Sequence, residues 1–147
     1  MEDNKYIKTG FAELDKQLKG GFKKGELVIL ASRPAVGKTS FAMNLVSNIA
    51  IDSEKKCAIY SIDTPKEELA QKILCSISGV CLYKALNGEL LDDDWKKLEE
   101  ARNKVEKSKI SISFTETLSD DEVIDECRKV KREEGLDLVV IDYVQIQ

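Results

Sequence analysis

The chain has 147 residues, enough for about one domain, and 42% of them are hydrophobic, which supports a globular fold with a buried core. The formal net charge of −4 argues against a generally basic surface for nucleic acids, although local loops can still touch DNA. No apolar stretch approaches the length of a membrane span, and the first residues lack the apolar region of a secretory signal. We therefore expect a cytoplasmic protein with no membrane partner.

The absence of histidine removes several kinds of catalytic site. Without it the chain can form no Ser–His or Cys–His nucleophile and no histidine general base. The four cysteines are irregularly spaced, with no C-x-x-C pair, and they predict reduced, mostly buried thiols rather than a zinc site. These thiols are Cys57, Cys75, Cys81 and Cys127.

The first third of the chain predicts a helix, a strand and a second helix. A short helix is expected over residues 11–18, whose apolar residues share one face. A continuous apolar run then predicts a strand over 26–31. The periodic pattern that follows predicts a helix over about 38–51.

The segment between this strand and this helix is the most informative part of the sequence. It reads Ser32-Arg33-Pro34-Ala35-Val36-Gly37-Lys38-Thr39, followed by Ser40, which is typical of a phosphate-binding loop. Backbone N–H groups of such a loop form an anion site, to which the helix N-terminus adds partial positive charge. Lys38 would reach the β- and γ-phosphates of a nucleoside triphosphate, and the Thr39 hydroxyl would ligate Mg²⁺. The strict pattern has glycine in place of Ser32, and the alternative is a plain strand-to-helix turn with a solvated lysine.

The middle of the chain predicts a second buried strand followed by a helix. The strand covers 57–62 and ends at Asp63. Thr64 is expected as the N-cap and Pro65 as the first residue of a helix that runs to about Ser78.

A further helix, with Asp92 or Asp93 expected as its N-cap, carries the only tryptophan of the chain, Trp95. An exposed tryptophan would suit base stacking. Its helical spacing with other apolar residues favours a place in the core instead.

The last third predicts a strand, a helix and a strand. The strands are expected over 109–114 and 137–142, and the helix begins at Ser119 as N-cap and ends near Gly135. Strands that alternate with helices predict an α/β fold with a mainly parallel sheet and helices on both faces.

The last predicted strand ends in an acid, Asp142, directly after the run Leu138-Val139-Val140-Ile141. Such a strand presents its carboxylate at the edge where open α/β sheets bind ligands. Asp142 would then hold Mg²⁺ opposite Thr39, directly or through water. The acid alone is a weak signal, but together with the phosphate-binding loop it is a strong one.

Several motifs, in order and spacing, resemble the ATPase domain of DnaB-type replicative helicases over nearly the whole chain. The resemblance rests on Thr9-Gly10-Phe11, Leu14-Asp15, Gly20-Gly21, Lys24-Gly25-Glu26-Leu27, Ala31-Ser32-Arg33-Pro34, Gly37-Lys38-Thr39, Leu86-Asn87-Gly88-Glu89-Leu90, Asp94-Trp95 and Ile141-Asp142-Tyr143-Val144-Gln145. It implies a RecA-like, P-loop NTPase fold, which here would be incomplete, because the chain stops soon after Asp142. The whole chain is then expected to be one partial ATPase domain, with a leading segment over 1–25 and a nucleotide-binding core over 26–147.

The resemblance also implies an activity and partners. Members of this family form hexameric rings, use ATP and Mg²⁺, move along single-stranded DNA and work with replication-initiation and loader proteins. By position, Lys38, Thr39 and Asp142 would be the catalytic and metal-binding residues. Gln145 would sense the γ-phosphate, unless it is simply an exposed residue near the end of the chain.

Asp63 departs from the family pattern, which has glutamate at this strand end to orient the attacking water. Aspartate reaches about 1.5 Å less, one C–C bond, and a misplacement of that size can cost about 10²-fold in rate. Asp63 would therefore act through a shift or an extra water, act as a poor base in a slow ATPase, or only cap the next helix.

The predicted activity is that of an ATP-dependent helicase, although by itself this chain is expected to hydrolyse ATP very slowly, because the family's arginine finger lies beyond Gln147. Three alternatives stay open at this stage. They are another RecA-like ATPase, a phosphate-loop kinase, and a short non-catalytic helicase paralogue that modulates ring assembly.

Overall fold

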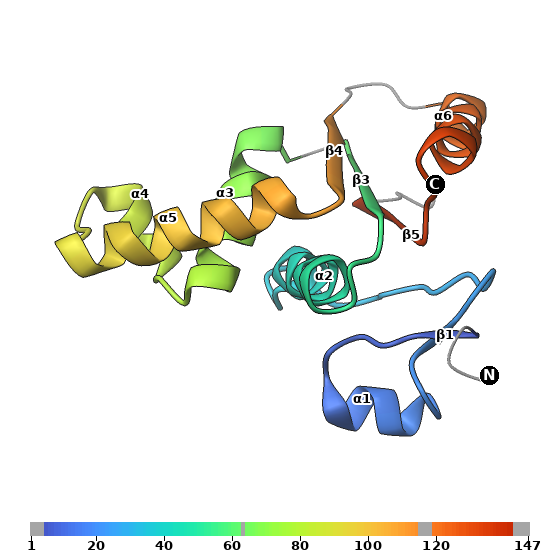
Figure 1. Cartoon of the computed structure of the whole chain (residues 1–147), viewed down its shortest axis with the longest axis horizontal. Coiled ribbons are helices and arrows are strands. Elements are labelled where there is room, and N and C mark those ends of the chain that lie inside the picture. Colours follow the sequence, from blue (N-terminus) through green and yellow to red (C-terminus); the bar gives the residue numbers. More distant parts are fainter. Residues whose placement is uncertain (1–4, 63, 115–118, 143–147) are drawn as a thin grey trace.

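A parallel three-stranded sheet forms the centre of the computed structural model, which describes residues 5–62, 64–114 and 119–142 (Figure 1). The strands are β3 (Cys57–Ser61), β4 (Ile110–Phe114) and β5 (Leu138–Asp142), in the order β4-β3-β5. The predicted strands over 57–62, 109–114 and 137–142 are therefore confirmed to within one residue at each end.

Helices cover both faces of this sheet, as expected for a parallel sheet. All five residues of β3 are buried. On one face, Cys57 and Ile59 pack in the cluster that α2 (Lys38–Ser47) and α3 (Lys66–Ser78) form. On the other, Ala58 and Tyr60 pack with Val123 of α6 (Asp120–Glu133). The alternation of side chains along β3 thus divides the core into two layers.

The helices follow the predicted order, with additions that the sequence patterns did not indicate. The antiparallel strand pair β1–β2, the helix α4 and the π-helical turn η1 that extends α2 were not predicted. The remaining elements are β1 (Tyr6–Ile7), α1 (Ala12–Gln17), β2 (Phe22–Lys23), α2 (Lys38–Ser47), η1 (Asn48–Asp52), α3 (Lys66–Ser78), α4 (Leu82–Asn87), α5 (Asp92–Lys107) and α6 (Asp120–Glu133).

Two predicted helix starts are displaced by a residue. Pro65, with ψ of 148°, is the N-cap of α3 rather than its first residue, and Thr64 lies outside the helix. Leu91 is the N-cap of α5, and its N–H donates to the carboxylate of Asp94 at 3.1 Å. Ser119 caps α6 as predicted, accepting a hydrogen bond from the N–H of Glu122.

The prediction that Trp95 belongs to the core is wrong, because its side chain is 61% exposed. The helix α5 packs against α3 through its later turns, where Ala101 is buried and Val105 contacts the main core. Its first turns project away from the sheet together with α4 (Figure 1), so the apolar spacing of Trp95 finds no covering layer.

The strand predicted over 26–31 is also not formed. Leu27 and Ile29 are 87% and 79% exposed, and none of the described strands pairs with this segment. A strand requires hydrogen bonds from a neighbour, and an apolar sequence alone does not supply them. The phosphate-binding loop is therefore preceded by an unpaired segment.

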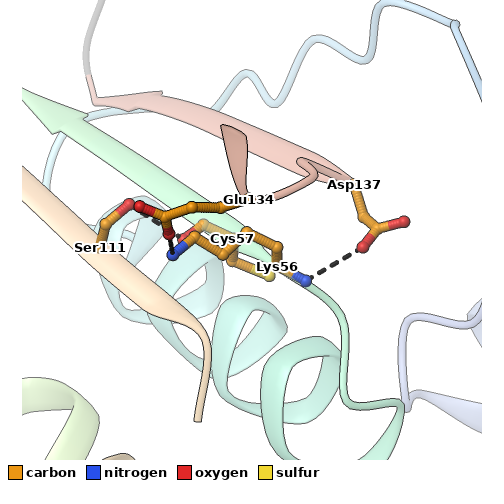
Figure 2. A network of polar contacts seen from close by, with 5 residues as sticks. All are labelled: Lys56, Cys57, Ser111, Glu134 and Asp137. Carbon is orange, nitrogen blue, oxygen red and sulfur yellow. Dashed lines mark hydrogen bonds and ion pairs between the residues drawn. The ribbon is translucent and has the colours of Figure 1, made fainter. Parts of the chain in front are cut away.

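The amino ends of β3 and β5 are joined by a polar cluster around Lys56 (Figure 2). The backbone N–H of Lys56 donates to the carboxylate of Asp137 at 3.0 Å, and its carbonyl accepts from the N–H of Asp137 and Leu138. The Lys56 ammonium lies 2.6 Å from a carboxylate oxygen of Glu134. This cluster, which we call the Lys56 clasp, fixes the strand register at its first pair, Cys57 with Leu138.

The thiols are free, and the prediction of mostly buried cysteines is confirmed for two of the four. Cys57 and Cys75 are buried, Cys127 is half-buried and Cys81 is exposed. Burial, with the nearby Asp137 carboxylate, raises the pKa of Cys57 to about 12. Within the described ranges no cluster of acidic or cysteine side chains could hold a metal ion.

Candidate nucleotide-binding site

The N-terminus of α2 has the backbone geometry of an anion-binding site. Gly37 is its N-cap, with a φ of 96°, and Ala35 two residues earlier has a φ of 61°. No side chain caps this end of α2, and the first helical hydrogen bond runs from the N–H of Phe41 to the carbonyl of Gly37 at 2.9 Å. The helix dipole and the direction of the backbone N–H groups favour an anion at such a helix N-terminus.

A network in the leading segment contacts this helix at both ends. The N–H and hydroxyl of Thr9 donate to one carboxylate oxygen of Asp15, at 2.8 Å and 2.7 Å. The side-chain amide of Asn48 donates to the carbonyl of Thr9 at 3.2 Å. Phe11 stacks on Phe41, with ring centroids 5.1 Å apart. The Thr9-to-Asp15 motif thus positions the helix that carries the phosphate-binding loop, a role that its sequence did not reveal.

The loop itself lies on the surface. Residues 32–37 and Ser40 are exposed, while Lys38 and Thr39 are half-buried at the start of α2. The hydroxyl of Ser32, which replaces the glycine of the strict pattern, donates to the carbonyl of Arg33 at 3.1 Å. Serine is therefore accommodated at this position without a buried side chain.

Asp142 lies at the carboxyl edge of the sheet, as predicted. It ends β5, pairs in register with Ser61 of β3 and is only 6% exposed. Its carbonyl accepts from the N–H of Ile62 at 3.1 Å, which keeps β3 and β5 together up to this edge. Thr39 and Asp142 offer a hydroxyl and a carboxylate, both hard oxygen ligands of the kind that Mg²⁺ prefers. That the two residues hold one ion stays a prediction.

Two predicted site residues, Asp63 and Gln145, lie outside the described residues. Each follows a strand whose end is described: Asp63 comes two residues after Ser61, and Gln145 three residues after Asp142. Because β3 and β5 are parallel, both strands end at the same edge of the sheet.

Comparison with known proteins decides the family. A model of the DnaB-like helicase C-terminal domain matches residues 6–147. The chain belongs to this family. The family match agrees with the order of motifs from Thr9 to Asp142, and it favours a helicase ATPase domain over a phosphate-loop kinase.

Curated relatives of this DnaB-like domain are replicative helicases. The chain is 37% identical over 140 residues to the replicative DNA helicase DnaC of Bacillus subtilis, and 36% identical to the replicative DNA helicase DnaB of Geobacillus stearothermophilus. Each match covers 95% of this chain and 31% of the relative. The chain thus spans about a third of the length of these relatives.

Solved structures of related proteins share the fold. One is described as a DnaB-like replicative helicase and its interactions with primase. The match covers 93% of this chain and 33% of the helicase chain, with a TM-score of 0.84 and 28% sequence identity. A second is described as an ATPase domain. The match covers 94% of this chain and 49% of the second chain, with a TM-score of 0.85 and 28% sequence identity. The predicted RecA-like α/β fold is therefore confirmed. None of the described helices is both long and apolar enough to cross a membrane.

Proposed function

We propose that this chain binds Mg²⁺–ATP at the N-terminus of α2 and belongs to a replicative helicase that moves along single-stranded DNA as a hexamer. The observation that carries the proposal is the uncapped first turn of α2, preceded by left-handed residues at Ala35 and Gly37. Membership of the DnaB-like family supports the choice of ATP as the anion. Primase, which the description of one structural neighbour names, and loader proteins are proposed partners of the whole helicase.

Each site residue has a defined role in this proposal. The backbone of residues 32–37 and the Lys38 ammonium would hold the phosphates, and Thr39 with Asp142 would hold Mg²⁺. When bound, the ion would neutralise charge on the β- and γ-phosphate oxygens. Asp63 would orient the attacking water, and Gln145 would sense the γ-phosphate at the strand edge.

A thermal-shift titration with Mg²⁺–ATP tests the binding site. A ligand present at about 100 times its Kd stabilises the native state by about 2.7 kcal/mol, which raises Tm by roughly 5–10 °C for a chain of this size. The Lys38→Ala variant should lose this shift, whereas the exposed Lys107→Ala variant on α5 should keep it. An equal shift in wild type and Lys38→Ala would remove Lys38 from the site.

A hydrolysis assay tests the proposed role of Asp63. Asp63→Glu restores the longer carboxylate that the family pattern expects. Placed in the full-length helicase, this variant should preserve or raise the rate of ATP hydrolysis. A rate more than about tenfold lower would contradict a water-orienting role for Asp63.

A further inference from the structure

The lysines of the leading segment gather in one hollow, away from the phosphate-binding loop. A cavity of about 600 Å³ lies between the β1 strand, the turn after α1 and the end of η1. Four of its lining residues are lysines and none is a carboxylate: Lys5, Lys8, Lys19 and Lys55. In a chain of net charge −4 this is a local reversal of sign.

The four ammonium groups are available to a ligand. Lys5, Lys8 and Lys19 are exposed, and Lys55 is half-exposed. None of the four takes part in an ion pair with another described residue. Among the described acids of the leading segment, Asp15 accepts two hydrogen bonds from Thr9.

The backbone around the hollow is held in an uncommon conformation. Besides Ala35, the non-glycine residues with positive φ among those described are Lys19, at 56°, and Glu54, at 52°, which precedes Lys55. The adjoining glycine turn packs tightly, because a Cβ at Gly21 would lie 2.2 Å from the carbonyl oxygen of Ile7. Lys19 and Glu54 each follow the C-cap of a helix, where a left-handed residue is a common helix ending, and the N–H groups of Lys19 and Gly20 close that of α1 onto the carbonyls of Lys16 and Asp15. Hydrogen bonds and close packing therefore fix the turns that line the hollow.

Among the described residues, the carbonyl end of η1 and two nearby acids oppose an anion in this place. The carbonyl end of η1, which ends at Asp52, contributes about half a negative charge. Asp52 and Glu54 are exposed near Lys55 but do not line the hollow. Of the described residues that line the hollow, four therefore carry a positive charge and none carries a negative one.

We propose that this hollow, the Lys5–Lys55 pocket, binds the phosphodiester backbone of single-stranded DNA as a contact separate from the nucleotide site. The choice of DNA over another polyanion rests on the proposed helicase function. Lysine suits the task because its ammonium contacts phosphate as a point charge without reading a base, which fits a strand of any sequence. The Lys5 ammonium also lies 6.0 Å from the ring centroid of Tyr6, which lines the same pocket.

The test is a fluorescence-anisotropy titration of the whole chain with a labelled oligothymidylate of about 20 nucleotides, repeated at several salt concentrations. Lys5, Lys8, Lys19 and Lys55 are all replaced by glutamine in one variant. Its matched control replaces four exposed lysines of α5 in the same way, so that the net charge changes equally: Lys96, Lys97, Lys104 and Lys107.

The pocket variant should bind at least about tenfold more weakly at roughly 50 mM salt, and its plot of log K against log salt should be shallower by about 2–3, since each phosphate contact contributes about 0.7. The α5 control should bind like wild type. Failure of wild type to bind the oligonucleotide, or equal losses in the two variants, would overturn the proposal.

Two further measurements keep the result interpretable. If the pocket variant does not fold, the extent of acetylation of each lysine is measured instead in the wild type, with and without the oligonucleotide. The four pocket lysines should be protected and the four α5 lysines should not, and the reverse pattern would overturn the proposal. The pocket variant should keep the thermal shift with Mg²⁺–ATP, so loss of DNA binding and loss of the ATP shift report on separate sites.

Discussion

Replacing Asp137 by alanine tests whether the Lys56 clasp stabilises the sheet. The carboxylate accepts the N–H of Lys56 at 3.0 Å, just before the first paired residues of β3 and β5 (Figure 2). Hydrogen bonds to charged groups contribute about 1.5–3 kcal/mol, but Asp137 is exposed and water competes for the donor, so we expect a loss of about 1 kcal/mol. The two hydrogen bonds that the Lys56 carbonyl accepts from the backbone remain, so the strand register should survive.

The measurement is urea unfolding followed by circular dichroism, with thermal melts alongside. The midpoint should fall without a change in the slope m, because the surface exposed on unfolding stays the same. A loss of about 1 kcal/mol should lower Tm by roughly 2–4 °C for a chain of this size. Asp137→Asn keeps a side-chain oxygen as acceptor and should lose less than Asp137→Ala.

The control is Asp125→Ala on α6, where an exposed carboxylate lies 3.5 Å from Arg128. Such surface pairs contribute little, so this variant should stay within about 0.5 kcal/mol of wild type. If Asp137→Ala is no less stable than Asp125→Ala, or if asparagine costs as much as alanine, the side-chain hydrogen bond does not stabilise the strand pair.

Three other measurements probe the same fold. The ammonium of Lys56 holds the pKa of Glu134 below its usual value near 4.5, so the ion pair stabilises the fold above that pH and its contribution is lost as the pH falls through the lowered pKa. Glu134→Gln should therefore reduce the loss of unfolding free energy at acid pH, and an unchanged loss would contradict the pairing. A disulfide reagent should modify the exposed Cys81 first and Cys57 only on unfolding, because burial raises the pKa of the Cys57 thiol to about 12. Rapid modification of Cys57 in the folded protein would refute its burial. Gly21→Ala should lower Tm more than Gly25→Ala, because a Cβ at Gly21 collides with the backbone of Ile7. A Cβ at Gly25 meets nothing within 4 Å, so that variant has only the left-handed strain of about 1–2 kcal/mol. Equal losses of Tm would contradict the close approach at Gly21.

The elements that the sequence predicted well are those whose signals are local. The turn at Gly37 before α2, the cap at Ser119 and the apolar runs of β3 and β5 each depend on residues adjacent in sequence, and each appears where expected. The parallel order of the sheet followed from the alternation of strands and helices. Asp142 was placed correctly because it is the last residue of such a strand.

The errors concern features that depend on distant neighbours. Residues 26–31 have the composition of a buried strand, yet strand formation requires a partner, and the structure supplies none among the described residues. Trp95 has a helical spacing with core residues, yet its turn of α5 extends past the layer that could cover it. Apolar periodicity indicates which side chains would gain from burial, but not whether another element reaches them.

The conformation of Ala35 connects the backbone of the loop to its proposed task. A left-handed conformation costs a non-glycine residue about 1–2 kcal/mol, and the exposed loop offers Ala35 no packing that would offset this cost. Without a function for this conformation, the backbone at Ala35 would be expected to adopt a negative φ, or the position would be expected to hold glycine, which the chain has at Gly37. The loop instead keeps the strained residue two positions before an uncapped helix N-terminus. Backbone N–H groups held in this way need little reorganisation to receive phosphate, so the strain is best explained as preorganisation for an anion.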